Sequence, residues 1–256
     1  MAVDTVARVR LLDGFSVEAG SGDRLDGQRC PAPELPRGVQ RLVARLCLAG
    51  RPARSAIAGE LWPDVPEEHA QGSLRSALWR LQKAVPGLVD ASGSALRLAS
   101  GVRVDVAELS AWARRVQDPA SRPEEIAAID PASRAELLPG WYDDWVLLER
   151  ERLRQLRMHG LERAALRLAA AGRYGEALQA AYAAVRAEPL RESAHRAVVR
   201  VHLSEGNPTE ALRAFELFRG LLADELGVAP TAALTGLVQG IPRPRSAPAG
   251  TAVTAR

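Results

Sequence analysis

The chain has 256 residues, of which 47% are hydrophobic and 25% are charged, so it is long enough for two domains that each bury a core. Its 34 basic and 31 acidic residues leave a net charge of only +3, and a case for nucleic-acid binding must therefore rest on local clusters of charge. No apolar run approaches the ~18 residues of a membrane span, and the N-terminus lacks the apolar core of a secretion signal. The two cysteines indicate no disulfide framework, and we expect a cytoplasmic protein that does not enter a membrane.

Short strands are predicted at the start of the chain. Apolar positions alternate there with polar and turn residues, namely Val9, Leu11, Phe15 and Val17. Asp13-Gly14 is a typical turn dipeptide, so we expect antiparallel strands on either side of it. Residues 18–36 are rich in Gly, Asp and Pro and predict a loop.

Three helices are predicted next. Over residues 37–50 apolar positions recur at i, i+3, i+4, i+7 and i+8, as on one face of a helix. A second helix is expected to begin at an N-cap, Ser55, and to end at Trp62-Pro63. After a polar turn, residues 72–85 predict a third helix, which Pro86-Gly87 ends.

The third predicted helix separates apolar from basic residues. Its apolar side chains fall within roughly 80° of one another on a helical wheel: Leu74, Ala77, Leu78, Leu81 and Val85. The opposite side carries Arg75, Ser76, Trp79, Arg80 and Lys83, the last being the only lysine of the chain. A tryptophan on this basic side has two explanations. It covers sugar and thymine-methyl surface of a bound DNA, or it packs under the next hairpin or against the second domain.

Residues 88–99 predict a hairpin with Arg97 on one strand. Strands, three helices and a hairpin follow one another in this order in winged-helix proteins, in which the last helix enters the major groove of DNA. By position, Arg80 is the candidate for pairing with guanine, and Arg75 and Lys83 are the candidates for phosphate contacts. A basic face that is merely solvated is the alternative.

The second half of the chain contains a repeat. Residues 171–178 and 205–212 align at an offset of 34, the period of tetratricopeptide repeats. Helices are predicted over about 145–171, 174–187, 191–205 and 208–226. On the first of these, Gly160 and Ala164 are small enough to permit close approach of another helix.

A domain boundary is expected near residue 104. Asp105 and Glu108 are spaced as a capping box and would begin the second domain. The predicted fold is mainly α with small β elements: a winged helix-turn-helix over 1–104, an all-α tetratricopeptide-like repeat domain over 105–236, and a disordered tail over 237–256.

The sequence lacks the motifs of catalytic and metal-binding sites. The only lysine follows Gln82, which excludes a P-loop, and neither a dinucleotide-binding glycine motif nor a nucleophile elbow is present. His195 and His202 lie seven residues apart, but no second ligand pair lies at metal-binding spacing. We therefore expect no catalytic residue, no cofactor and no metal, and a protein that is not an enzyme.

Several stretches resemble one protein family. They are LRSALWRLQK, LLPGWYDDWVLLERERLRQLR, AAGRYGEALQAA, AEPLRESAHRAVVRVHLSEGNPTEALRAFE and LADELGVAP, and they are similar to the SARP family, the antibiotic regulatory proteins of actinomycetes. The similarity covers residues 8–232 and is most specific in the second half. It implies an OmpR-like winged helix followed by the family's tetratricopeptide-like bacterial transcriptional activator domain.

The resemblance also implies a function. It implies a sequence-specific DNA-binding activator of transcription, usually of a secondary-metabolite biosynthetic gene cluster. The implied partners are double-stranded DNA at promoter direct repeats, bound by a homodimer, and RNA polymerase with its principal sigma factor. The implied DNA contacts are Arg75, Ser76, Trp79, Arg80 and Lys83 on the recognition helix and a wing around Ser92–Arg97.

Two departures from the family pattern leave a second interpretation open. Gln82 stands where OmpR-like helices often have a cation, and the wing is poor in Arg and Lys. The alternative is a protein-interaction adaptor that works through the helical repeats without specific DNA binding.

Overall fold

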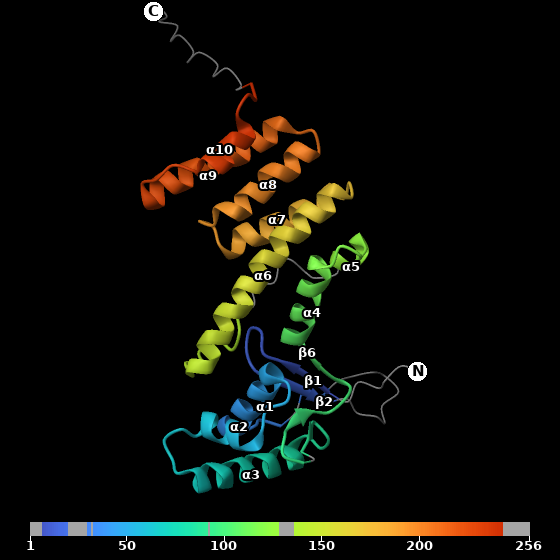
Figure 1. The fold of residues 1–256 in the computed structure, drawn as a ribbon, viewed down its shortest axis with the longest axis vertical. Coiled ribbons are helices and arrows are strands. Elements are labelled where there is room, and N and C mark those ends of the chain that lie inside the picture. The colour runs from blue at the N-terminus through green and yellow to red at the C-terminus, as the bar shows by residue number, and fades with distance from the viewer. Residues whose placement is uncertain (1–6, 20–29, 32, 92, 128–135, 243–256) are drawn as a thin grey trace, which may run out of the picture. The chain divides into compact units, whose positions relative to one another are not determined.

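The computed structural model describes residues 7–19, 30–31, 33–91, 93–127 and 136–242 (Figure 1). By its contacts the chain divides into two compact units. The first unit comprises residues 1–121 and 133–160, and the second comprises 122–132 and 161–256. No helix among the described residues is both long enough and apolar enough to cross a membrane.

A small sheet begins the first unit. Its strands are β1 (Ala7–Arg10), β2 (Ser16–Ala19), β3 (Cys30–Pro31) and β6 (Val102–Val104), in the order β3-β2-β1-β6. β1 pairs antiparallel with β2 and parallel with β6. The turn between β1 and β2 has positive φ at Asp13 and Gly14, as the turn dipeptide predicts. The loop expected over 18–36 was partly wrong, because β2 reaches Ala19 and two-residue β3 pairs with it.

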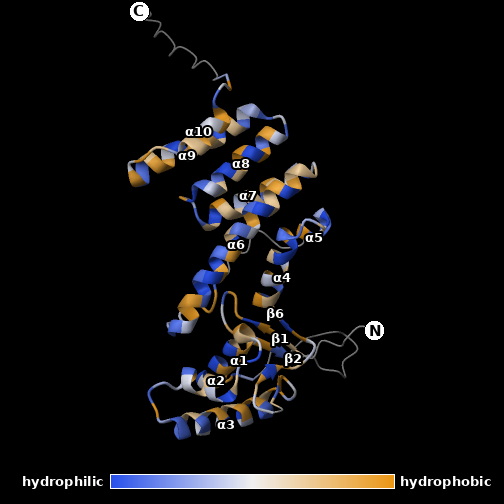
Figure 2. Cartoon of the chain, viewed as in Figure 1, coloured by the Kyte–Doolittle hydropathy of each residue, from blue (hydrophilic) through white to orange (hydrophobic). Residues whose placement is uncertain are grey.

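Three helices follow: α1 (Arg37–Ala49), α2 (Arg54–Leu61) and α3 (Glu67–Ala84). They contact one another, and their buried side chains are the apolar ones that the periodicity predicts. Hydrophobic and hydrophilic residues (orange and blue in Figure 2) alternate along these helices. Ser55 is not an N-cap, because α2 already begins at Arg54 without a side-chain cap. α3 begins earlier than expected, at Glu67. The two glutamates in its first turn complement the positive end of the helix dipole.

The predicted hairpin is present as β4 (Val89–Asp90) and β5 (Arg97–Leu98), which pair antiparallel. The first half of the chain therefore has the strands, three helices and hairpin of a winged helix. We call this hairpin the wing.

The helix after the sheet, α4 (Asp105–Gln117), belongs to the first unit, because it contacts α1, β1 and β6. The contacts thus divide the chain after residues 121, 132 and 160, and not near residue 104, where the sequence predicted a domain boundary. Asp105 does not form the expected capping box. Its carboxylate instead accepts the backbone N–H groups of Leu11 and Leu12, each at 2.9 Å, and that of Val106 at 2.7 Å. Burial raises the pKa of Asp105, and these three hydrogen bonds oppose the shift.

A row of arginines on α1 holds the segment that leads into the long helix α6 (Asp144–Ala170). We call Arg37, Arg41 and Arg45 the arginine row. Arg37 lies over the Trp141 ring at 3.5 Å, Arg41 pairs with Asp143 at 2.6 Å, and Arg45 lies 5.9 Å from the centroid of Trp145. Cation–π contacts and a mostly buried ion pair therefore fix this segment to α1.

We expect Asp143→Asn to lower the free energy of unfolding of the first unit by about 1–3 kcal/mol, because it leaves the Arg41 guanidinium without its counter-charge. The side chains of Arg41 and Asp143 are only 23% and 16% exposed. Glu149→Gln is the control, since its partner Arg152 is 52% exposed, and it should cost less than ~1 kcal/mol. Urea unfolding of both variants measures the difference. Equal losses would contradict the anchoring role of Asp143.

The second unit is helical. It contains α5 (Pro123–Ile126), the C-terminal part of α6, α7 (Tyr174–Ala187), α8 (Glu192–Ser204), α9 (Pro208–Leu226) and α10 (Ala232–Val238). The four helices expected from residue 145 onward are confirmed to within a residue at each end. α10 was not expected, and Val238 within it is buried, so the expected disordered tail does not begin at 237. Most of that tail, 243–256, lies outside the described residues.

The 34-residue offset reappears in the geometry of two turns. Gly172 and Gly206 both have positive φ, 74° and 83°. After each glycine the same hydrogen bond returns to the preceding helix, from Arg173 N–H to the Leu168 carbonyl at 2.9 Å and from Asn207 N–H to the His202 carbonyl at 2.8 Å. The sequence repeat is thus a structural repeat of helix pairs.

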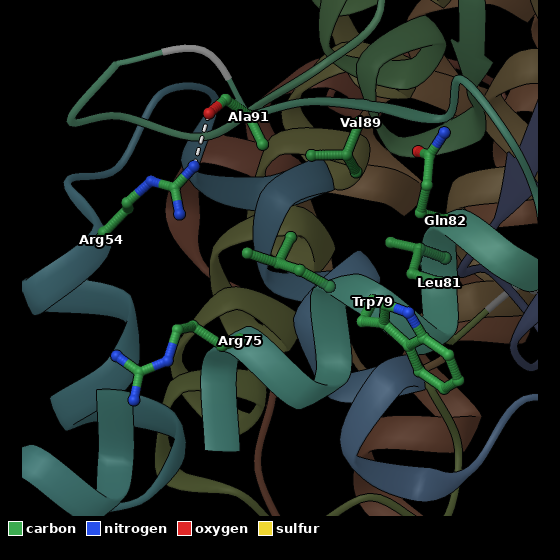
Figure 3. A pocket seen from close by; sticks show the side chains of 8 residues that line it. Arg54, Arg75, Trp79, Leu81, Gln82, Val89 and Ala91 are labelled. Carbon is green, nitrogen blue, oxygen red and sulfur yellow. Dashed lines mark hydrogen bonds between the residues drawn. The ribbon is translucent and has the colours of Figure 1, made fainter. Parts of the chain in front are cut away.

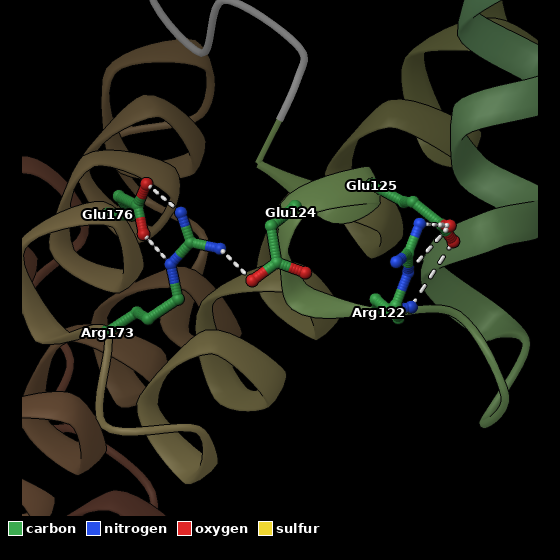
Figure 4. A network of polar contacts seen from close by, with 5 residues as sticks. All are labelled: Arg122, Glu124, Glu125, Arg173 and Glu176. Carbon is green, nitrogen blue, oxygen red and sulfur yellow. Dashed lines mark hydrogen bonds and ion pairs between the residues drawn. The ribbon is translucent and has the colours of Figure 1, made fainter.

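α5 is tied to the turn before α7 by charged side chains (Figure 4). Arg173 pairs with Glu176 in its own turn and with Glu124 of α5, the second contact at 3.3 Å. Arg122 pairs with Glu125 at 3.2 Å on the other side of α5. All five residues belong to the second unit, so this network joins two of its elements.

His195 is a partly buried titratable side chain of the second unit. Its ring stacks on Phe218 with centroids 3.9 Å apart, and its Nε2 donates to the Pro189 carbonyl at 2.8 Å. Burial lowers the pKa of His195, with the hydrogen bond acting in the opposite direction. Below the ordinary histidine pKa of about 6.5 the unfolded chain takes up the proton first, so stability is lost as pH falls through the folded-state pKa.

We therefore expect unfolding of the second unit to become easier as the pH falls from about 7.5 through the ordinary histidine pKa and toward the lowered pKa of the folded state. His195→Gln removes the titrating group and should flatten this dependence, whereas His159→Gln, at an exposed position of α6, should not. Denaturant unfolding across the pH range measures both. An unchanged pH dependence in His195→Gln would contradict the prediction.

Candidate nucleic-acid interface

The outward face of α3 carries the residues that the sequence singles out. Leu74, Ala77 and Leu81 are buried and fix the back of the helix. The structure brings Arg75, Ser76, Trp79, Arg80 and Lys83 together on the exposed side. α3 therefore presents a polar, basic ridge held from behind by leucines and alanine.

The basic side chains of this ridge are exposed. Within the described part of the chain, no carboxylate forms an ion pair with Arg75, Arg80 or Lys83. Two exposed arginines of α6 differ, since Arg152 pairs with Glu149 and Arg154 pairs with Glu151, each at 2.8 Å. The positive charge of α3 is therefore available to an external anion.

Trp79 lies in the middle of the ridge with 65% of its surface exposed. Lys83 Nζ lies 5.4 Å from the centroid of its ring, a cation–π contact. Such exposure excludes the interpretation in which Trp79 is buried beneath the wing. The ring offers a flat apolar surface beside the ammonium group.

The wing differs from expectation in its charge. Arg97 donates to the Asp90 carboxylate from Nε at 2.9 Å and from Nη2 at 2.6 Å. Its guanidinium is thus paired within the hairpin, because the register of β4 and β5 places the two residues opposite each other. Ser92, the first residue of the expected wing contacts, lies outside the described residues.

A groove separates the ridge of α3 from the wing (Figure 3). Its volume is about 420 Å³, and its lining residues are Arg54, Arg75, Leu78, Trp79, Leu81, Gln82, Val89 and Ala91. Most of these side chains are apolar, with arginines at one end. Gln82, noted in the sequence as a departure from the family pattern, borders this groove.

A second groove, of about 600 Å³, runs along the other side of α3. It is lined by the N-terminal end of α1, by Trp62 and by α3 residues that include Glu68, Ser76 and Arg80, and Arg75 borders both grooves. The basic ridge thus stands between two depressions. An exposed α-helix fits the major groove of DNA, which is about 12 Å wide. The two DNA backbones that border the major groove would then lie in the depressions on either side of α3.

The sequence did not reveal the role of Arg54. Its side chain donates to carbonyl groups of the wing, those of Ala91 and Gly93. Nothing in the spacing of residues 52–56 signals this contact, because it joins segments nearly forty residues apart.

The second half of the chain matches a known domain family. The sequence model of the bacterial transcriptional activator domain matches residues 104–241. Regulatory protein AfsR of Streptomyces coelicolor is 33% identical over 214 residues, which is 78% of this chain and 21% of that protein. The chain thus spans about a fifth of the length of this relative.

A solved structure shares the fold. Mycobacterium tuberculosis EmbR, in complex with a low-affinity phosphopeptide, aligns with a TM-score of 0.60 at 20% identity, over 91% of this chain and 64% of that one. At this identity the likeness concerns the fold. It agrees with a winged helix followed by helical repeats.

Proposed function

Because the chain belongs to the SARP family of bacterial transcriptional activators, whose activator domain it carries over residues 104–241, we propose that it activates transcription by binding a specific DNA sequence through α3. The family consists of transcription regulators and not of enzymes. In this proposal the winged helix binds the promoter sequence, and the helical repeats bind the transcription machinery.

The observation that carries the proposal is the unpaired charge of α3. Arg75, Arg80 and Lys83 are exposed and lack an ion pair among the described residues, whereas Arg152 and Arg154 of α6 are neutralised by glutamates on their own helix. Binding of an anionic duplex is most favourable at cations that need not first break an ion pair with a carboxylate. The ridge between two grooves adds a shape that suits the major groove.

We assign the side chains of the ridge different tasks. Arg80 is placed to pair with a guanine edge, which gives specificity, while Arg75 and Lys83 contact phosphates, which gives affinity. Ser76 Oγ donates to the Gly72 carbonyl at 3.0 Å and retains acceptor capacity for an amino group at a base edge. Trp79 covers sugar and thymine-methyl surface. Arg97 contributes only through the outer side of its pair with Asp90.

The proposed partners follow from the family. They are direct repeats in promoter DNA, bound by two copies of the chain, and RNA polymerase with its principal sigma factor. The target we propose is a secondary-metabolite gene cluster, and the protein would act in the cytoplasm, where the bacterial chromosome lies.

Binding of the full chain to DNA fragments from upstream of its own and neighbouring genes tests the proposal. We expect at least one fragment to form a complex at or below micromolar protein that resists random-sequence competitor and weakens steeply with salt. The absence of any salt-sensitive complex at micromolar protein, on all fragments, would contradict DNA recognition.

Transcription in vitro tests activation. Adding the protein to RNA polymerase and the bound promoter should raise the amount of transcript, and a fragment without the bound site should give no increase. Recovery of a protein partner by the full chain, with no DNA complex, would favour the adaptor function instead.

A further inference from the structure

The wing is attached to the start of α2 by both backbone and side chain. The backbone N–H of Arg54 donates to the Ser94 carbonyl, and that of Leu96 donates to the Pro52 carbonyl, each at 3.0 Å. The Arg54 side chain adds bonds from Nε to the Gly93 carbonyl at 3.1 Å and from Nη2 to the Ala91 carbonyl. One guanidinium therefore donates hydrogen bonds to two carbonyl groups near the tip of the wing. Figure 3 draws the bond to Ala91 as a dashed line.

Arg54 also borders the groove between the wing and α3. Arg54 lines the same groove as Arg75 and Trp79 of α3 and as Val89 and Ala91 of the wing. The side chain that holds the wing thus borders the space between the wing and the ridge. If the wing moves away from α2, the width of the groove changes.

The wing itself offers little charge of its own. Arg97 is paired with Asp90, and Arg54 spends two of its donors on carbonyl groups of the wing. What the wing adds to DNA binding must therefore depend on where its backbone lies more than on the charge of its side chains.

We infer that Arg54 is a positioning residue that fixes the wing at a set distance from α3, so that both fit one duplex together. This inference rests on the proposed function. It assigns to Arg54 a role in DNA binding that acts through the wing and not through a phosphate contact.

Three variants test the inference in the full chain. Arg54→Gln removes the charge and the fork of donors, and Arg54→Lys keeps the charge but cannot hold two carbonyls in the same way. Arg51→Gln is the matched control, because it removes an equal charge from an exposed position three residues away whose side chain forms no hydrogen bond or ion pair with the described residues of the wing.

The first measurement is amide hydrogen exchange in the free protein. Both Arg54 variants should speed exchange at the N–H groups of residues 54 and 96, and Arg51→Gln should leave it unchanged. This readout needs no DNA, so it judges the grip on the wing even if the proposed function fails. Exchange that is unchanged in both Arg54 variants would overturn the inference.

The second measurement is affinity for the specific DNA site at several salt concentrations. Arg54→Gln and Arg54→Lys should weaken binding alike, by about three- to tenfold, because both release the wing. The slope of log affinity against log salt should stay that of the wild type in both. Full affinity in Arg54→Lys with a slope reduced by about 0.9 in Arg54→Gln would show a phosphate contact and overturn the inference. Faster wing exchange without loss of affinity would overturn it too.

Discussion

Gly160→Ala is expected to destabilise the first unit by about 2–3 kcal/mol, even though alanine is the better helix former. A Cβ at position 160 would lie 2.4 Å from Cζ3 and 2.9 Å from Cη2 of Trp112. The Trp112 ring on α4 is only 2% exposed, so it has no free space to move into. The added methyl group must displace the ring or bend α6.

Gly59→Ala is the matched control in the same unit. Gly59 also lies inside a helix, α2, but a Cβ there meets no atom within 4 Å. The control should be neutral or stabilising by up to about 1 kcal/mol. Urea unfolding measures both variants, and equal changes in the free energy of unfolding would contradict the close contact of α4 and α6. In a Trp112→Phe background, Gly160→Ala should cost less.

Arg80→Ala is expected to weaken binding to the specific site by about 1–3 kcal/mol, while affinity for random DNA changes little. A guanidinium that pairs with a guanine edge contributes only where that base is present. Lys83→Ala should instead weaken specific and random DNA alike, since an ammonium group meets phosphates on any sequence. Competition titrations with both DNAs separate the two effects.

Arg152→Ala is the control for these two variants, because this arginine is paired with Glu149 on its own helix. It should leave both affinities unchanged. If Arg80→Ala and Lys83→Ala lowered specific and random binding in the same proportion, the division of tasks between the two side chains would be wrong.

Periodicity predicted the long helices well, because their apolar stripes and their end signals agree. The expected ranges 174–187 and 208–226 match α7 and α9. Where either signal is absent, prediction failed. The first turn of α3 is polar and precedes the apolar stripe, and α10 is too short to show a clear period.

The sequence predicted which residues of α3 share the candidate site, but not which of the candidate cations form ion pairs. The helical wheel placed Arg75, Arg80 and Lys83 on one face. It could not show that they are unpaired while Arg97 binds Asp90, because that pairing depends on the strand register of a hairpin. The role of Arg54 was beyond the sequence for the same reason, since its contacts join segments distant along the chain. Gly160 was recognised as a place of close approach, but its partner Trp112 became visible only in the fold.

The central claim is that Arg75, Arg80 and Lys83 of α3 are free for DNA, whereas the arginines that glutamates neutralise on other helices are not. Its most direct test is the salt dependence of binding for two triple variants that remove equal charge. One carries Arg75→Gln, Arg80→Gln and Lys83→Gln, and the other carries Arg152→Gln, Arg154→Gln and Arg219→Gln, all three paired with glutamates. We predict that the slope of log affinity against log salt becomes shallower by about 2 in the first variant, which loses the phosphate contacts of Arg75 and Lys83, and stays unchanged in the second. Equal slopes in the two variants would contradict the account.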